Sequence, residues 1–242
     1  MTAWSSARVL VVGVGGLGCP AALALARAGV GTLGLVDDDL VDVSNLHRQI
    51  LFDDDDVGRP KVPAAAARLS ALAPSVQVEL HETRLLPDCA LSLVRQYDLV
   101  VEGSDNFATK FLAADACAIA NKPIVHAAAV RWHGTALAVG PTGGPCYRCI
   151  FEDVPLENAP NCAEAGVVGP MVGVVAAAQV DLALSVLAGE DVFGELFTFD
   201  GKTLASRRRR VPRRTSCPLC GDGARIRDIE PKRYVEGICT VA

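Results

Sequence analysis

The sequence predicts an α/β fold in which helices cover both faces of a doubly wound, mostly parallel sheet. Short apolar runs rich in Val and Leu alternate with Ala-rich helical stretches through residues 8–130. A glycine-rich turn joins the first strand to the first helix. With 242 residues, half of them hydrophobic, the chain is long enough to bury a substantial core.

The expected elements of this half follow in order. We expect strands at 8–13, 33–37, 76–80, 99–101 and 124–127, and helices at 17–28, 62–72 and 107–120. Gly29 closes the first helix, and Pro74 stops the second. Strands that alternate with helices in this way are typical of a parallel sheet.

After Trp132 the pattern changes, and we expect an antiparallel extension of the sheet. Strands are expected at 135–139, 196–199 and 203–210, whereas 152–166 has no periodicity and is expected to be a long loop. The run RRRR at 207–210 fits an exposed edge strand, and the alternative is a basic patch that meets an acidic partner. We expect a single domain over 1–242, with halves at about 8–130 and 131–225 and a tail at 226–242.

Composition argues against two classes of partner. The net charge of −5 argues against nucleic acid as the main partner. The apolar segment 171–189 is long enough to cross a membrane, but Gln179 and Asp181 lie inside it, and an Asp at the bilayer centre costs about 3 kcal/mol. A helix in the core or at a subunit interface, and no membrane, is the better interpretation. Nine Cys without a visible secretory signal favour a reducing, cytoplasmic compartment.

The turn Gly13-Val14-Gly15-Gly16-Leu17-Gly18 fits G-x-G-x-x-G between a strand and a helix, so the fold is expected to be Rossmann-like. Glycines let backbone N–H groups approach phosphates, and the helix N-terminus favours negative charge. Asp37 ends the next strand, where a carboxylate binds ribose hydroxyls. These features fit NAD as well as ATP.

The segment after Asp37 favours ATP. We expect Ser44 to cap a short helix that places Asn45 and Arg48 on one face. Arg48 would reach the phosphates and Lys61 would add a second cation, which suits a triphosphate better than a dinucleotide. The neighbouring Asp39 and Gln49 complete the candidate cofactor-binding residues of this segment.

Asp105 and Asn106 follow the fourth strand, at the carboxyl edge where α/β sheets bind ligands. A carboxylate that faces a triphosphate is best explained as a Mg²⁺ ligand.

Two Cys pairs predict a structural zinc site. Cys146 and Cys149 form one C-x-x-C pair, and Cys217 and Cys220 form the other. Four thiolates in two such turns are the usual frame for tetrahedral Zn²⁺. The alternatives are a redox dithiol or free thiols. Cys162 lies apart from both pairs, in the long loop. Three further cysteines fall on apolar faces of expected helices or in nearby turns and are expected to lie in the core, namely Cys19, Cys89 and Cys117.

Taken together and in order, GVGGLG, LVDDDLVDVSNLHRQ, GRPK, GSDN, CYRC and CPLC closely resemble the MoeB/ThiF adenylyltransferases, relatives of ubiquitin-activating enzymes. The resemblance implies that Gly15, Asp37, Asn45, Arg48, Lys61 and Asp105 hold ATP and Mg²⁺. It implies that the Gly-Gly carboxylate of a small ubiquitin-like sulfur-carrier protein attacks the α-phosphate of ATP, giving an acyl-adenylate and pyrophosphate. It also implies a homodimer, and carrier and zinc binding by residues 131–225.

The chain departs from the family pattern in one respect and leaves several alternatives open. Only seven residues precede Arg8, where family members carry an arm whose Arg enters the partner's ATP site. We also expect a separate sulfur donor, because no rhodanese domain follows. Cys162 either forms a covalent link or transfers sulfur, as in some relatives, or is an ordinary loop residue.

The alternatives to adenylation of a sulfur carrier are a catalytically weak scaffold subunit and an ATP-dependent enzyme that activates a non-protein carboxylate. A nicotinamide dehydrogenase is disfavoured because it would leave Arg48 without a purpose. Which carrier is bound, and whether the pathway makes molybdopterin or thiamine, stays open.

Overall fold

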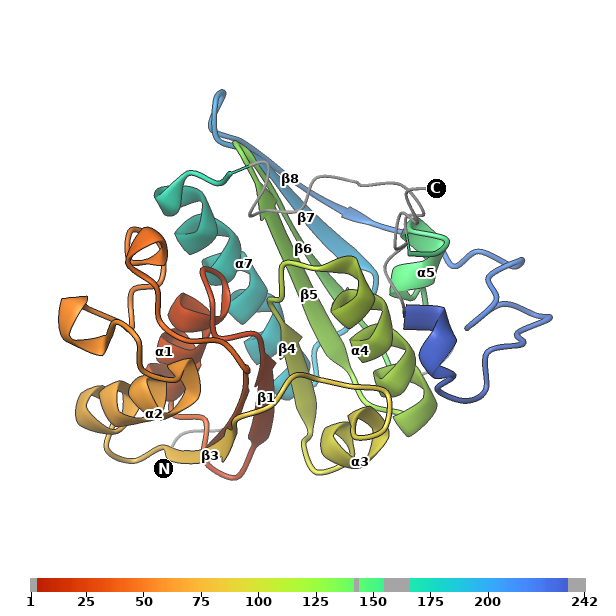
Figure 1. Ribbon diagram of the computed structural model, residues 1–242. Coiled ribbons are helices and arrows are strands. Elements are labelled where there is room, and N and C mark those ends of the chain that lie inside the picture. Colours follow the sequence, from red (N-terminus) through yellow and green to blue (C-terminus); the bar gives the residue numbers. More distant parts are fainter. Residues whose placement is uncertain (1–3, 142–143, 155–165, 235–242) are drawn as a thin grey trace, which may run out of the picture.

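A single eight-stranded sheet forms the centre of the molecule (Figure 1). The computed structural model describes residues 4–141, 144–154 and 166–234. Strand order across the sheet is β3-β2-β1-β4-β5-β6-β7-β8. The first five strands in this order are parallel, and the last three are antiparallel to their neighbours. The predicted fold class, a mostly parallel sheet with an antiparallel extension, is therefore confirmed.

Strands inside the parallel part of the sheet are apolar and almost entirely buried, as expected for such strands. All eight strands are short. They are β1 (Arg8–Val12), β2 (Thr32–Val36), β3 (Gln77–His81), β4 (Leu99–Glu102), β5 (Ile124–Val130), β6 (His133–Val139), β7 (Glu195–Asp200) and β8 (Ala205–Arg210). In register, Val11 lies between Leu35 on β2 and Val101 on β4.

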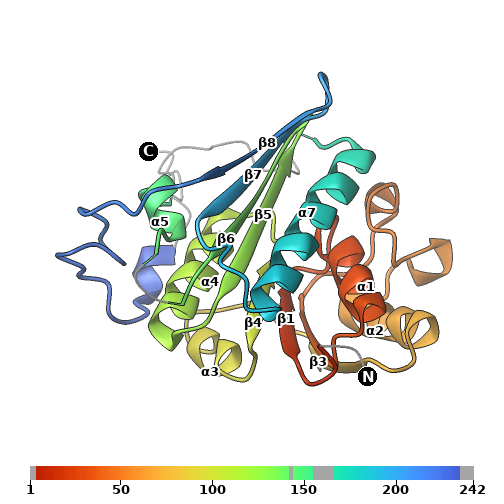
Figure 2. The ribbon, with the colours of Figure 1, turned by 180° about the vertical axis from the view of Figure 1, so that it is seen from behind.

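The helices divide between the two faces of the sheet (Figures 1 and 2). They are α1 (Gly18–Ala28), α2 (Lys61–Leu72), α3 (Ala90–Val94), α4 (Phe107–Ala120), α5 (Tyr147–Ile150) and α7 (Gly169–Leu187), with 3₁₀ turns at Val43–Asn45, Asp54–Asp56 and Pro231–Tyr234. One apolar core joins α1, α2 and α7 to the sheet, and a second joins α3, α4 and the segments around α5 to its other face. The doubly wound arrangement follows from these two cores.

Helix α7 has the length and apolar composition of a membrane-crossing helix, yet it packs against β5, β6 and α1. Inside the core, the side-chain amide of Gln179 donates to the carbonyl oxygens of Glu102 and Val125 at 2.8 and 2.9 Å. This polar residue therefore ties the helix to β4 and β5. Helix α7 is the central helix of one core in this fold.

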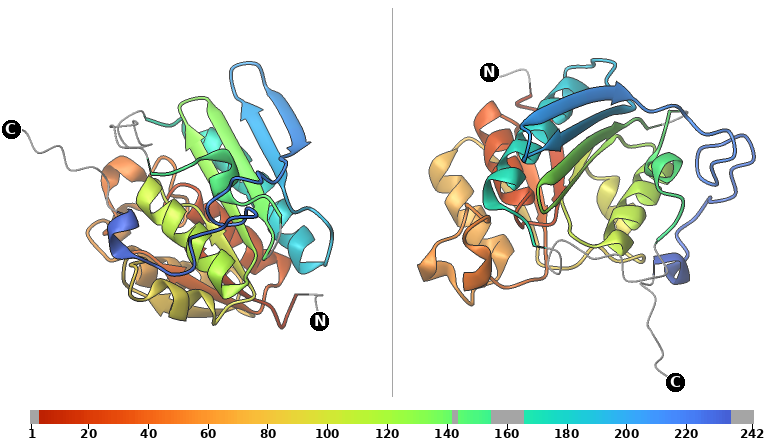
Figure 3. Two further views of the ribbon diagram at one scale, coloured as in Figure 1. Left: turned by 90° about the vertical axis from the view of Figure 1, so that its right-hand side faces the viewer. Right: turned by 90° about the horizontal axis from the view of Figure 1, so that it is seen from above.

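Strand β8 forms an exposed edge, as predicted for the arginine run (Figure 3). Arg208 pairs with Asp181 on α7 and with Glu195 on β7, and Arg210 pairs with Asp191. Charged side chains of this kind discourage edge-to-edge association of sheets.

The observed boundaries differ from the predicted ones at several ends. Strand β3 begins and ends one residue later than predicted, and β8 begins at Ala205 because Leu204 takes a turn conformation with φ of 56°. Helix α1 begins at Gly18, one residue late. Helices α3 and α5 were not predicted, because segments of five and four residues show no helical periodicity.

The contact between β6 and α7 predicts a strong effect of one methyl group. A β-carbon added at Gly134 would overlap Cγ2 of Val175, which is fully buried and held in one rotamer by its helix. Gly134→Ala should therefore lower the free energy of unfolding by about 1–3 kcal/mol, measured by urea denaturation. Gly173→Ala is the matched control on α7, where no atom lies within 4 Å of the added carbon. It should be neutral or stabilising by up to about 1 kcal/mol, and equal losses in both variants would contradict this packing.

Candidate nucleotide and metal sites

A cavity opens at the carboxyl ends of β1, β2 and β4 and encloses about 840 Å³ with its mouth. It lies at the point where the strand order reverses, because β1 pairs with β2 on one side and with β4 on the other. Of the candidate cofactor-binding residues, all except Gly18 and Asn45 line it, namely Gly13, Gly15, Gly16, Asp37, Asp39, Arg48, Gln49, Lys61, Asp105 and Asn106.

The glycine turn forms the floor of the cavity, and close approach explains its composition. Gly13 has φ of 84°, and a β-carbon there would lie 3.0 Å from the backbone nitrogen of Ser104. A β-carbon at Gly18 would overlap the carbonyl oxygen of Gly13. Gly18 thus shapes the turn from behind the cavity, while Gly15 and Gly16 leave room for a ligand at the start of α1.

Asp37, Asp39 and Lys61 form a charged group at one side of the cavity. Lys61 Nζ lies 2.7 Å from Asp39 Oδ2 and 3.8 Å from Asp37 Oδ1, and the lysine side chain is nearly buried. Burial raises the pKa of Asp37, and this rise is opposed by Lys61 and by N–H groups of Asp39 and Val14 that donate to the carboxylate. The cation predicted at Lys61 is therefore present, but two carboxylates share it.

Arg48 packs against the glycine turn, with its Cδ 3.3 Å from the β-carbon position of Gly16. Its guanidinium donates to Asn45 Oδ1, so Asn45 orients Arg48 from outside the cavity. The expectation that Ser44 caps this turn was wrong. Asp42 is the cap, and its side chain accepts from the backbone N–H of Ser44 at 2.8 Å. Asp42, two residues earlier, supplies the same type of acceptor as a Ser, and the sequence pattern did not distinguish the two.

Asp105 is exposed at the mouth of the cavity, in the loop between β4 and α4. Asn106 next to it caps α4, and its side chain accepts from the N–H of Thr109 at 2.8 Å. An exposed carboxylate that lines the same cavity as Arg48 and Lys61 is a suitable ligand for a hard divalent cation such as Mg²⁺ that accompanies phosphates.

Several lining residues were not among the predicted ones. Arg84 lies after β3 and pairs with Asp38 at 3.7 Å across the rim. Its position just past a strand end was the available signal, but the strand was placed one residue too early. Apolar residues from β5 and from around α7 complete the wall, namely Ala129, Val167 and Val172. They come from the second half of the chain, and no local motif marks them.

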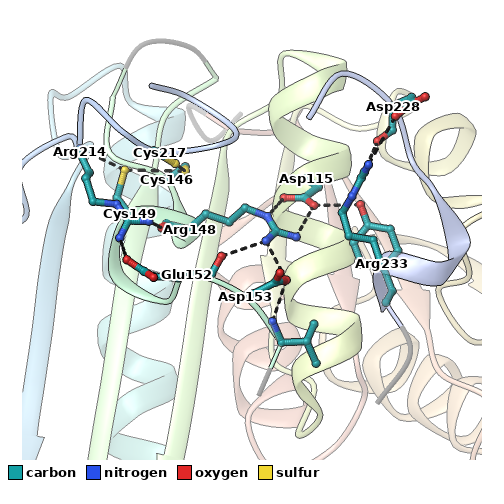
Figure 4. Close-up of polar contacts among 12 residues, drawn as sticks. Asp115, Cys146, Arg148, Cys149, Glu152, Asp153, Arg214, Cys217, Asp228 and Arg233 are labelled. Carbon is teal, nitrogen blue, oxygen red and sulfur yellow. Dashed lines mark hydrogen bonds and ion pairs between the residues drawn. The ribbon is translucent and has the colours of Figure 1, made fainter. Parts of the chain in front are cut away.

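The four predicted zinc ligands converge at one point. Figure 4 shows three of them, Cys146, Cys149 and Cys217. Cys146 Sγ lies 3.5 Å from Cys217 Sγ, and Cys149 Sγ lies 3.4 Å from Cys220 Sγ. Zn–S bonds of about 2.3 Å in a tetrahedron place sulfurs about 3.8 Å apart. The donor set and its spacing therefore fit Zn²⁺ closely.

Ion pairs lie beside the cysteine cluster, and the one between Arg148 and Asp115 is buried (Figure 4). Arg148, between the first two cysteines, is 1% exposed and makes a two-pronged contact with Asp115 on α4, at 2.8 and 2.9 Å. It also contacts Asp153, and Tyr234 donates to Asp115 at 2.9 Å. The arginine thus fixes the first Cys turn to α4 and to residues near the end of the described chain.

The remaining cysteine predictions have mixed outcomes. Cys19 and Cys117 are fully buried, whereas Cys89 is only partly buried in a turn, so its placement in the core was wrong. Cys162 and Cys239 lie outside the described residues.

Comparisons with known proteins agree with these features. The ThiF family model matches residues 1–219. The chain is 45% identical over 231 residues to the sulfur carrier protein adenylyltransferase of Thermus thermophilus, covering 92% of this chain and 85% of that protein. It is 43% identical to the SAMP-activating enzyme E1 of Haloferax volcanii, covering 98% and 88%.

Other matches are to longer or more distant proteins. The Sus scrofa adenylyltransferase and sulfurtransferase MOCS3 is 43% identical, and the chain spans 52% of its length. A crystal structure of Escherichia coli MccB with ATP has a TM-score of 0.80 at 24% identity, over 90% of this chain and 68% of that one, which shows the shared fold.

The resemblance inferred from the motifs is confirmed by the family model and by the relatives that are matched over most of their length. From GVGGLG to CPLC, the chain belongs to the ThiF family.

Proposed function

We propose that this protein is an ATP-dependent adenylyltransferase that activates the C-terminal Gly-Gly carboxylate of a small ubiquitin-like sulfur-carrier protein. The supporting observation is the cavity that brings Arg48, Lys61 and Asp105 around one glycine turn. Relatives named sulfur carrier protein adenylyltransferase and SAMP-activating enzyme support the type of substrate.

Each group at the cavity has a role in binding ATP. The N-terminus of α1 and the glycine turn receive phosphates, and Asp37 at the end of β2 accepts hydrogen bonds from the ribose hydroxyls. Arg48 and Lys61 neutralise phosphate charge. Because Lys61 Nζ is 2.7 Å from Asp39, it exchanges this carboxylate for a phosphate oxygen when ATP binds.

Asp105 would hold Mg²⁺ together with phosphate oxygens, and that ion would supply further charge neutralisation. The exposed carboxylate lines the same cavity as both cations, which fits this role.

The reaction needs no nucleophile from the enzyme. A carboxylate oxygen of the carrier attacks the α-phosphorus, an acyl–phosphate bond forms, and the bond from the α-phosphorus to the bridging oxygen breaks. The bonding electrons leave with pyrophosphate. The carboxylate is already ionised at neutral pH, so the chain contributes positioning and charge stabilisation instead of proton transfer.

Further parts of the proposal are a homodimer, a separate sulfur donor and a cytoplasmic location. They are supported by the family and by nine cysteines of which four form a metal-type cluster. The role of Cys162 belongs to the same proposal, as the residue that would link to or exchange sulfur with the carrier.

Exchange of labelled pyrophosphate into ATP tests the adenylation step. With Mg²⁺ and a cognate Gly-Gly carrier, the wild-type protein should catalyse exchange. Arg48→Ala and Asp105→Ala should each slow it about 100-fold or more, because each removes charge stabilisation at the phosphates. Arg59→Ala is the matched control, since Arg59 is exposed, pairs with Asp56 and does not line the cavity. It should leave the rate unchanged.

Failure of exchange with every Gly-Gly carrier of the same genome, despite ATP binding, would contradict the proposed function and favour a scaffold role. Exchange that responds to a small carboxylate in place of a carrier would contradict the protein substrate.

The cysteine cluster should hold one zinc ion per chain, which metal analysis of the purified protein measures. Cys149→Ser and Cys217→Ser should each lose the metal and lower the melting temperature by about 5–15 °C. The metal joins the two C-x-x-C segments, and its binding energy contributes to the stability of the folded state. Cys89→Ser, outside the cluster, should retain metal and melting temperature. A wild-type protein that is purified without metal and melts at the same temperature as the Cys149→Ser and Cys217→Ser variants would argue for free thiols.

A further inference from the structure

A buried carboxylate lies directly behind the loop that carries Asp105. Glu102, the last residue of β4, is completely buried. Its Oε1 accepts hydrogen bonds from the backbone nitrogen and the hydroxyl of Ser104. Its Oε2 accepts from Lys110 Nζ at 2.8 Å and from His126 Nδ1 at 3.1 Å. One carboxylate thus receives four hydrogen bonds from three parts of the chain.

The loop between Glu102 and Asp105 is short and is held from two sides. The N–H of Gly103 donates to Val12 at the end of β1, at 3.0 Å. Ser104 lies against Gly13 on one side and is bonded to Glu102 on the other. Asp105 is the next residue, so the Glu102–Ser104 contact fixes the direction in which its backbone leaves the sheet.

Lys110 is the cation that faces Glu102. It is 5% exposed on the first turns of α4, and it also donates to the carbonyl oxygen of Ala127 at 2.7 Å. Burial alone raises the pKa of Glu102, but Lys110 and then His126 outweigh it and hold the pKa at about 2. The carboxylate is therefore charged at neutral pH, and charge-assisted hydrogen bonds to Ser104 are stronger than neutral ones.

The other groups packed around Glu102 do not replace this charge. Burial lowers the pKa of His126, so its ring is neutral and donates through Nδ1. Gln179 from α7 donates to the backbone oxygen of Glu102, not to its carboxylate. Tyr147 and Cys117 are close enough for the Glu102 charge to raise the pKa of each, after burial. Among the described residues, Lys110 is the facing cation.

We propose that the Glu102–Lys110 pair positions Asp105 for Mg²⁺·ATP through the hydrogen bonds from Glu102 to Ser104. The inference rests on the proposed function and adds two positioning residues behind the magnesium ligand. Neither Glu102 nor Lys110 lines the cavity, so they act through the loop and not by contact with the nucleotide. Partners that lie behind a metal ligand commonly tune its affinity.

Calorimetric titration with ATP, with Mg²⁺ and separately with EDTA, tests the inference in two variants. Glu102→Gln keeps the shape of the side chain but removes its charge at every pH. It should weaken Mg²⁺·ATP binding about 10- to 100-fold. The loss of ATP affinity measured in EDTA should be smaller, because Asp37 and the glycine turn are unaffected.

Lys110→Met provides the signature that a purely structural role would not give. Without the facing cation, burial keeps Glu102 protonated at neutral pH, and the carboxyl group ionises only as the pH rises. The Mg²⁺·ATP affinity of Lys110→Met should therefore be low at pH 6.5 and recover toward pH 9. The affinity of Glu102→Gln should stay low over the whole pH range. Lys110→Arg retains the charge and should stay near the wild-type affinity.

The matched control for loss of a buried ion pair is Asp115→Asn, on the same helix but facing Arg148. It should lower the melting temperature and leave the Mg²⁺-dependent part of ATP affinity unchanged. Equal losses with and without Mg²⁺, or wild-type affinity in Glu102→Gln and Lys110→Met despite lower melting temperatures, would overturn the inference. A wild-type protein that does not bind Mg²⁺·ATP would instead overturn the proposed function, and the inference with it.

Discussion

The pairing of β4 with β1 is the constraint on which the rest of this structure depends. The chain builds β1, β2 and β3 outward in one direction and then returns to place β4 on the other side of β1. The connections after β1 and after β4 therefore leave the sheet toward opposite faces, and a cavity opens between them. The glycine turn and the Asp105 loop meet there. They are so close that a β-carbon at Gly13 would lie 3.0 Å from the backbone nitrogen of Ser104.

This meeting point also explains why charge is concentrated at one edge of the sheet. Carboxyl ends of parallel strands bring Asp37 and Asp105 to the same edge, and Arg48 and Lys61 come from the connection after β2. Both cations already have partners within the chain. Lys61 contacts two carboxylates, and Arg48 donates a hydrogen bond to Asn45. Under the proposed function, a polyanion that enters the cavity would exchange these internal partners for phosphate oxygens, and the cations would have partners in both arrangements.

Local sequence patterns predicted the features that local chemistry determines. The alternation of strands and helices, the G-x-G-x-x-G turn and the spacing of the two C-x-x-C pairs each depend on a few adjacent residues. The prediction was less successful in two places. Asp42 caps the turn that Ser44 was expected to cap, and Cys89, which was expected in the core, is only partly buried.

Features that depend on distant contacts had no local signal. Glu102 looks like an ordinary strand-end residue in the sequence, because its partners Lys110 and His126 come from the next helix and the next strand. Arg148 is the largest fully buried side chain, yet in the sequence it is one Arg between two cysteines. Its burial depends on Asp115, which only the packing of α5 against α4 brings within 2.8 Å.

Helix α4 connects the two candidate centres, and its buried charges show how. At its N-terminal end, Asn106 caps the helix beside Asp105, and Lys110 pairs with Glu102 behind the Asp105 loop. Further along, Asp115 binds Arg148 inside the first Cys turn. Each contact pairs a fully buried charge with a partner on another segment, and loss of one partner leaves the other unpaired at high cost. The helix is thus held at both ends by charge as well as by apolar packing, and a shift of α4 would disturb the cysteine cluster and the Asp105 loop together. The position of Asp105 therefore depends on the N-terminal end of α4 as well as on the loop that carries it.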